Sequence, residues 1–111
     1  MTEFIKEADL NYDLILKRVG AYTQGDEDFD VFKCPVCNRI YLIEYEADTI
    51  FTDPGNLSAL QSGESFSCLS CGYSFPKGEA IIGPKASDKY RVTRSELLAS
   101  KWSWLLSQRT T

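Results

Sequence analysis

The sequence predicts an α+β fold in which a small antiparallel sheet is flanked by an N-terminal and a C-terminal helix. Three observations predict it. Apolar residues recur with a helical period near both ends of the chain, and short runs rich in β-branched and aromatic residues fill the middle. The four cysteines form two C-x-x-C pairs within that middle region. With 111 residues we expect a single domain, 1–111, made of segments 1–30, 31–82 and 83–111.

Residues 3–19 are predicted to form an amphipathic helix, followed by an acidic loop at 23–30. At 100° per residue one face of this helix is apolar, and we expect that face to be core. Gly20 follows as the residue that ends the helix. Asp9 is an alternative N-cap for a shorter helix that begins near Leu10. The apolar face comprises Phe4, Ile5, Ala8, Tyr12, Ile15, Leu16 and Val19.

The middle segment is predicted to be a sheet of about four to six short antiparallel strands. Residues 53–56 read Asp-Pro-Gly-Asn, with proline at the second position and glycine at the third, as in a type II turn. Residues 57–65 are predicted to be a loop. The predicted strands are 31–33, 39–46, 48–52, 66–67, 73–75 and 79–82.

A second helix is predicted over residues 93–107, after a linker. Its start fits a capping box, in which Thr93 and Glu96 bond each other's backbone amides. Trp102 and Trp104 lie about 200° apart around a helix, so both cannot point into one core. A helix with apolar residues over more than half its circumference is usually covered on two sides or bound to a partner. The predicted partner-binding residues are Trp102, Trp104 and Leu97.

The cysteine pairs carry the strongest chemical signal in the sequence. Two C-x-x-C pairs separated by about thirty residues are typical of a tetrahedral metal site made of four thiolates. Each pair is followed by a residue that adopts a positive φ at low cost, Asn38 after the first and Gly72 after the second. A reducing compartment favours metal binding over a disulfide. The predicted ligands of one structural Zn²⁺ are Cys34, Cys37, Cys68 and Cys71.

These pairs resemble the knuckles of the Cys₄ zinc-ribbon superfamily, which shares its knuckle with rubredoxins. Residues 34–38 are similar to one ribbon knuckle, with asparagine where glycine is usual, and residues 68–73 are similar to the other. The resemblance covers about residues 31–82. It implies a fold and a structural metal, and it leaves the partner open. Zinc ribbons serve in transcription and translation factors, in nucleic-acid enzymes and as small protein-docking modules.

Several catalytic classes are excluded by residue type. The chain has no histidine, which excludes Ser-His-Asp and Cys-His catalysis, HExxH metalloproteases and zinc deaminases. A site with four cysteine ligands has no open position for water, so we expect no enzyme activity. Iron in a rubredoxin-like electron carrier is the alternative. Rubredoxins are smaller and pack aromatic residues around the metal, whereas this chain spends residues on two helices.

Charge and hydropathy bound the partners. The net charge is −4, and an acidic chain binds nucleic acid poorly, because that affinity depends on neutralising phosphates. We therefore expect a non-catalytic module that docks on another protein, or on a second copy, through the C-terminal helix. A nucleic-acid-binding ribbon in transcription or translation, using the basic stretch 85–109, is the alternative. The sequence shows neither a membrane span nor a signal peptide, so we expect a cytoplasmic protein.

Overall fold

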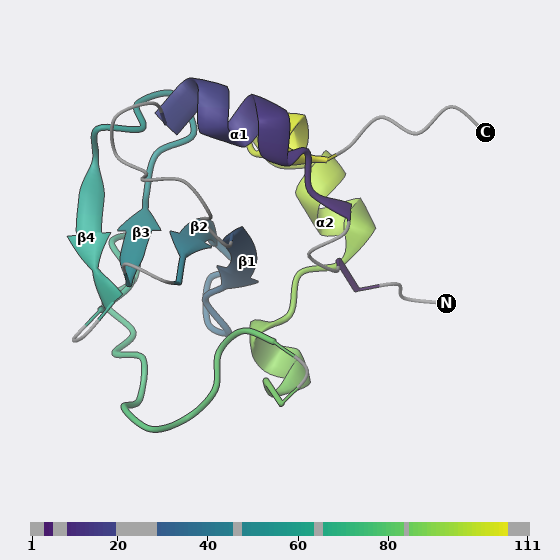
Figure 1. Ribbon diagram of the computed structural model, residues 1–111. Coiled ribbons are helices and arrows are strands. Elements are labelled where there is room, and N and C mark those ends of the chain that lie inside the picture. Colours follow the sequence, from purple (N-terminus) through teal and green to yellow (C-terminus); the bar gives the residue numbers. More distant parts are fainter. Residues whose placement is uncertain are drawn as a thin grey trace.

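A computed structural model describes residues 4–5, 9–19, 29–45, 48–63, 66–83 and 85–106. Its central element is one antiparallel sheet in which each strand pairs with the next along the chain, in the order β1-β2-β3-β4 (Figure 1). The mixed α and β content agrees with the predicted fold class. The strands are β1 (Phe29–Lys33), β2 (Ile40–Glu44), β3 (Thr49–Phe51) and β4 (Leu60–Ser62).

The helical elements are short and belong to the two ends of the chain. In Figure 1, α1 lies on one side of the sheet, close to the C-terminal turn, and the green segment after β4 runs on the other side. None of the helices in the described part of the chain is both long enough and apolar enough to cross a lipid bilayer. They are α1 (Tyr12–Val19), η4 (Asp88–Tyr90), α2 (Arg94–Leu98) and η5 (Ser103–Leu105).

The N-terminal helix is shorter than predicted, because the described residues Ile5 and Leu10 bond the C-terminal part of the chain and do not continue the helix. The Ile5 amide donates a hydrogen bond of 2.8 Å to the Val92 carbonyl, and Leu10 forms a β-bridge with Leu106. The Asn11 carboxamide oxygen then accepts from a first-turn amide at 3.2 Å, which is the geometry of an N-cap. The alternative of a helix that begins near Leu10 was therefore closer. Gly20 and most of the predicted acidic loop lie outside the described residues.

The C-terminal helix is also interrupted, although its predicted start is confirmed. The Thr93 hydroxyl accepts from the Glu96 amide at 3.1 Å, and the Glu96 carboxylate accepts from the Thr93 amide at 2.9 Å. Helix α2 then ends at Leu98, where the prediction continued to residue 107. Ser100 explains the break, because its hydroxyl donates to the Leu97 carbonyl at 2.7 Å. A serine side chain that bonds nearby backbone competes with the helical pattern.

The strand predictions hold for the first half of the sheet and fail near its edge. Runs 31–33, 39–46 and 48–52 correspond to β1, β2 and β3. The predicted loop 57–65 contains β4, an exposed edge strand whose Leu-Gln-Ser sequence carries no strand pattern. Runs 66–67 and 73–75 form an isolated bridge, Ser67 to Ser74, and the predicted strand 79–82 is absent.

The turn at 53–56 forms, but it is not of type II. The Asn56 amide donates to the Asp53 carbonyl at 3.1 Å and closes the turn. Gly55 is not among the described glycines with positive φ, which a type II turn requires at this position. The Asp53 carboxylate accepts from the Gly55 amide at 2.9 Å instead. This side-chain bond stabilises the alternative backbone conformation.

The sheet separates two hydrophobic cores, since alternate side chains of a strand point to opposite faces. We call them the helical-face core and the aromatic-face core. Figure 1 shows α1 and α2 on the first face and the green segment on the second, to which η4 contributes Tyr90. The buried residues of the helical-face core are Leu10, Ile15, Val19, Phe29, Val31, Ile40, Leu42, Phe51, Val92, Leu97, Trp102, Leu105 and Leu106. Those of the aromatic-face core are Phe32, Cys34, Tyr41, Ile43, Ile50, Phe66, Cys68, Phe75 and Tyr90.

Candidate metal centre

Four cysteine sulfurs gather at the edge of the aromatic-face core. All four Sγ atoms lie within 4.8 Å of one another. Across the two pairs, the Sγ atoms of Cys34 and Cys71 are 3.4 Å apart, and those of Cys37 and Cys68 are 3.5 Å apart. Zinc bound at about 2.3 Å by four sulfurs in a tetrahedron requires sulfur separations of about 3.8 Å. The cysteines are thus positioned to bind one metal ion, as the sequence predicted.

The two C-x-x-C segments form equivalent knuckles. In each knuckle, the carbonyl of the first cysteine accepts a hydrogen bond from the amide of the residue that follows the second cysteine. The amide of the first cysteine donates to the carbonyl of the residue after that one. The predicted positive φ is confirmed at Asn38 (65°) and at Gly72 (82°). The four bonds are Asn38 to Cys34 (2.9 Å), Cys34 to Arg39 (2.9 Å), Gly72 to Cys68 (2.8 Å) and Cys68 to Tyr73 (2.8 Å).

Each knuckle supplies one buried and one exposed sulfur. Cys34 directly follows β1 and Cys68 directly follows the bridge residue Ser67, and both are buried in the aromatic-face core. Cys37 and Cys71 are exposed. The cluster therefore faces aromatic side chains on one side and solvent on the other.

Two side chains of the segment after the first knuckle hold the second knuckle in place. The Tyr41 hydroxyl lies 3.2 Å from the Cys68 Sγ and accepts from the Leu69 amide at 3.0 Å. Arg39 donates to the Ser70 hydroxyl at 2.9 Å and to the Thr52 carbonyl at 2.8 Å. Sequence reasoning had given Tyr41 no role at the site. The strand register carried the missing signal, because Tyr41 pairs with Phe32 on the face that also bears Cys34.

The surroundings of the sulfurs shift the pKa values of two cysteine thiols in opposite directions. Burial acts to raise the pKa of the Cys68 thiol, but hydrogen bonds from the Tyr41 hydroxyl and from backbone amides outweigh it and lower the pKa to about 6. Desolvation raises the pKa of the Cys37 thiol to about 12. These contacts thus favour the thiolate form of Cys68, whereas desolvation favours the protonated form of Cys37. Binding a cation with all four sulfurs must therefore release protons, which makes the affinity fall as the pH falls.

The structure places the predicted partner-binding residues away from the sulfurs. Trp102 and Leu97 are buried in the helical-face core, and the Trp102 indole donates to the Ile40 carbonyl at 2.9 Å. Trp104 is half-buried beside Trp102, with the Arg18 guanidinium 4.4 Å from its ring centroid. The expected exposure of the indoles assumed a continuous helix. The chain instead turns after α2 and brings Trp102 against β2.

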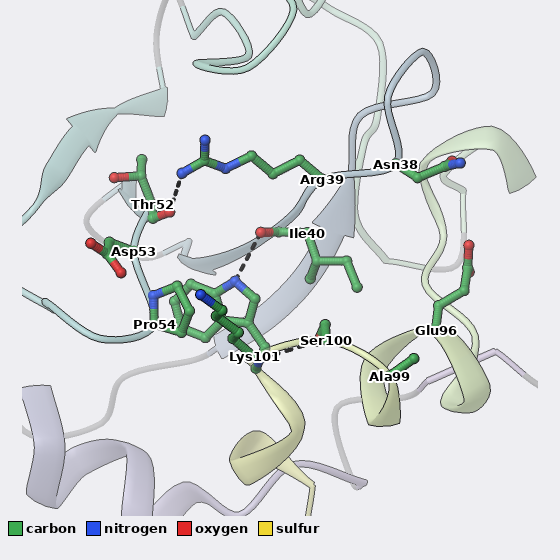
Figure 2. Close-up of a pocket in the computed structure, with 11 residues that line it drawn as sticks. Asn38, Arg39, Ile40, Thr52, Asp53, Pro54, Glu96, Ala99, Ser100 and Lys101 are labelled. Carbon is green, nitrogen blue, oxygen red and sulfur yellow. Dashed lines mark hydrogen bonds between the residues drawn. The ribbon is translucent and has the colours of Figure 1, made fainter.

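A cavity of about 650 Å³ opens between the end of the first knuckle and the chain after α2. Figure 2 shows Arg39 reaching across it to Thr52, with Glu96 at the α2 side. Its charged side chains are of both signs, and two of them are already paired, Arg39 with the Thr52 carbonyl and Glu96 with Lys33 at 2.6 Å. No cysteine lines the cavity.

The basic C-terminal stretch contains cations that contact acidic side chains of the same chain. Lys89 lies 3.7 Å from Glu79, and Arg91 lies 3.7 Å from Asp88. The Arg91 guanidinium also donates to the Ala86 carbonyl at 3.1 Å. These contacts direct part of the basic charge toward the protein itself.

Fold and site together define a small metal-binding structural module with one four-cysteine site. Comparison of the chain with family models, with curated proteins and with solved structures gives no match. The resemblance to zinc ribbons therefore depends on the knuckle residues and their geometry.

Proposed function

We propose that the chain is a non-catalytic zinc module that docks on another protein. The observation that carries the proposal is the packing of four sulfurs, within 4.8 Å of one another, by two equivalent knuckles. Zn²⁺ prefers a closed tetrahedral site of this ligand set, and such a site leaves no position for water or substrate. Cys34, Cys37, Cys68 and Cys71 would each supply one thiolate.

The docking role is supported by the side chains that the fold leaves in solvent. Val36 and Leu69 lie between the cysteines of their knuckles and are 64% and 52% exposed, and Leu98 on α2 is 57% exposed. The ion pair of Lys33 with Glu96 holds the start of α2 beside the strand that leads into the first knuckle. Of the three predicted partner-binding residues, Trp102 and Leu97 are core and Trp104 is half-buried, so we add the exposed Leu98, which was not predicted, to Trp104 as the docking surface of the C-terminal region.

Metal analysis of the purified chain tests the zinc site. We expect one zinc per chain and no other metal in comparable amount. A metal-free chain with a normal cooperative melt would contradict the proposal.

Docking is tested separately, with variants that leave the cysteines in place. Val36→Ser with Leu69→Ser, and Leu98→Ser, are compared with the wild type by affinity capture and by light scattering, each at equal zinc content. We expect a specific partner, or a dimer, to be lost in at least one variant. Identical capture and mass for all chains would refute docking by these side chains.

A second candidate, a rubredoxin-like iron electron carrier, is favoured by one observation. Phe32, Tyr41, Phe66 and Phe75 pack together with Cys34 and Cys68, with ring centroids 4.9 to 6.0 Å apart in the contacting pairs. Aromatic residues packed around the metal are a feature of rubredoxins. Colour separates the candidates, because a ferric Cys₄ site is red and a zinc site is colourless.

A further inference from the structure

The Tyr41 side chain contacts the sulfur of a predicted ligand, Cys68, and is itself enclosed by the core. It is fully buried, and its ring lies 5.5 Å from that of Phe32 and 4.9 Å from that of Phe66, centroid to centroid. Because strand β2 and these two rings fix the side chain, its hydroxyl has a defined position 3.2 Å from the Cys68 Sγ. A pre-set hydroxyl of this kind can orient a ligand without losing side-chain entropy when metal binds.

The direction of the hydrogen bond follows from what the hydroxyl already accepts. The Leu69 amide donates to the Tyr41 oxygen at 3.0 Å, which leaves the hydroxyl proton free for a second partner. A sulfur bound to a metal is a thiolate, which carries no proton and can only accept. Tyr41 must therefore donate to Cys68 in the loaded protein.

The two knuckles differ at the position that Tyr41 contacts. The first knuckle has Pro35 after its first cysteine, and proline has no amide proton to satisfy. The second has Leu69 there, and its amide finds the Tyr41 hydroxyl. One hydroxyl thus joins backbone and sulfur of the second knuckle to a central strand of the sheet.

We infer that Tyr41 is a positioning residue for the metal, whose hydroxyl donates to the Cys68 thiolate and fixes the second knuckle against β2. The inference rests on the proposed function, because it requires Cys68 to be a metal ligand. Removing a group that hydrogen-bonds to a metal ligand without contacting the metal typically lowers metal affinity about 10- to 100-fold. We expect an effect of that size here.

The test compares Tyr41→Phe with Tyr90→Phe. Tyr90 is also fully buried in the aromatic-face core, and its hydroxyl also forms a hydrogen bond, at 2.9 Å to Tyr73. Tyr90→Phe therefore removes a similarly buried, hydrogen-bonded hydroxyl and should cost similar folding stability. Zinc affinity is measured by competition with a chromophoric chelator. We expect a loss of about tenfold or more for Tyr41→Phe and a smaller change for Tyr90→Phe.

Cobalt substitution supplies a readout that a purely structural role would not move. A hydrogen bond to a thiolate lowers the energy of its lone pairs, so removing it should shift the sulfur-to-cobalt charge-transfer band to longer wavelength. We expect this shift in Tyr41→Phe and not in Tyr90→Phe. Equal bands and equal affinities for both variants would overturn the inference. A wild type that binds no cobalt would overturn the proposed function along with it.

A measurement on the wild type makes the test independent of how the variants fold. In the chain loaded with ¹¹³Cd, a hydrogen bond from Tyr41 to the Cys68 sulfur predicts a scalar coupling between the metal and the Tyr41 hydroxyl proton. Detection of that coupling supports the inference. A loaded chain in which the hydroxyl proton is resolved and shows no coupling overturns it.

Discussion

The two faces of the sheet are closed by different means. The helical-face core is covered by α1, α2 and η5, and it buries mainly aliphatic side chains around Trp102. The aromatic-face core is covered by the short 3-10 helix η4, which buries Tyr90 in it, and by the segment from Phe66 to Gly83, which forms one isolated β-bridge and neither a helix nor a strand in its described residues. One face is thus closed by helical elements with their own backbone hydrogen bonds, whereas the other is closed by a loop and the single turn of η4.

Because a loop helps to close the aromatic face, we expect the bound metal ion to be needed to order that loop. A loop loses much conformational entropy when it becomes ordered, and it has few backbone hydrogen bonds that offset this loss. The second knuckle is tied to the sheet by Tyr41 and Arg39 and by the sulfur cluster. We therefore expect perturbations of the second knuckle and of its ties to the sheet to act through metal affinity, and perturbations of the helical face to act on stability alone.

The largest effect is expected for Cys68→Ser, which removes a buried ligand. Zinc binding at sites of this kind contributes on the order of 10–16 kcal/mol near neutral pH, which is comparable to the whole stability of a small domain. The variant should bind no stoichiometric zinc and should lose its cooperative melt. Ser67→Ala, a change at the exposed neighbouring residue, is the control and should keep both. A normal melt for Cys68→Ser would show that the aromatic face closes without metal.

Leu97→Ala tests the helical face. Leu97 is fully buried in the helical-face core, and truncating such a leucine costs about 2–5 kcal/mol through lost burial and the cavity it leaves. Denaturant unfolding of the zinc-loaded chain should show this loss, while the cobalt charge-transfer band stays unchanged. The adjacent Leu98 is 57% exposed, so Leu98→Ala should change stability by no more than about 0.5 kcal/mol. A changed cobalt band in Leu97→Ala would mean that the two faces are coupled.

Glu96→Gln tests the link between α2 and β1. Burial acts to raise the pKa of the Glu96 carboxyl, but hydrogen bonds from Lys33 and Thr93 outweigh it and hold the pKa below its ordinary value of 4.5. Such a carboxyl stabilises the fold above the unfolded pKa, and this contribution is lost as the pH falls through the lower folded pKa. Glutamine keeps the capping bond but removes the charge. We expect a loss of about 1 kcal/mol at pH 7 that vanishes in acid.

The control for Glu96→Gln is Asp88→Asn. The Asp88 side chain is 81% exposed and lies 3.7 Å from Arg91, and exposed pairs contribute little. Its stability difference from the wild type should be close to zero at both pH values. A loss in Glu96→Gln that persists in acid would mean that the carboxylate charge is not the cause.

The metal site was predictable from sequence because its geometry is local. Each knuckle places two sulfurs through the backbone of five residues, and the positive φ at Asn38 and Gly72 is signalled by residue type. The start of α2 was predictable for the same reason, since Thr93 and Glu96 are three residues apart.

The remaining features depend on partners distant in sequence. Residues 4–5 are extended because they pair with residues 92–93, and no local signal reports that pairing. Trp102 is buried because Ser100 interrupts the helix and turns the indole toward Ile40, 62 positions away. Tyr41 reads locally as an ordinary strand residue, and only its approach to Cys68 gives it a role at the site.

The smallest effect contrasts two glycines. Gly55 lies in the turn beside Leu57, which packs against the helical-face core; its φ is not positive, and an added Cβ would lie 3.5 Å from the Asp53 carboxylate, an ordinary contact. Gly55→Ala should therefore stabilise the chain by about 0.4–1 kcal/mol through reduced entropy of the unfolded state. Gly72 has φ of 82°, so Gly72→Ala should destabilise by about 1 kcal/mol although no atom lies within 4 Å of the added Cβ.

Denaturant midpoints of the zinc-loaded variants measure both effects. The type II turn predicted from Asp-Pro-Gly-Asn would place Gly55 at positive φ. With that turn, Gly55→Ala and Gly72→Ala would both destabilise the chain. If Gly55→Ala destabilises the chain, the result would support the type II turn predicted from the sequence. Opposite signs would show that the Asp53 side chain, by bonding the Gly55 amide at 2.9 Å, decides the backbone of this turn.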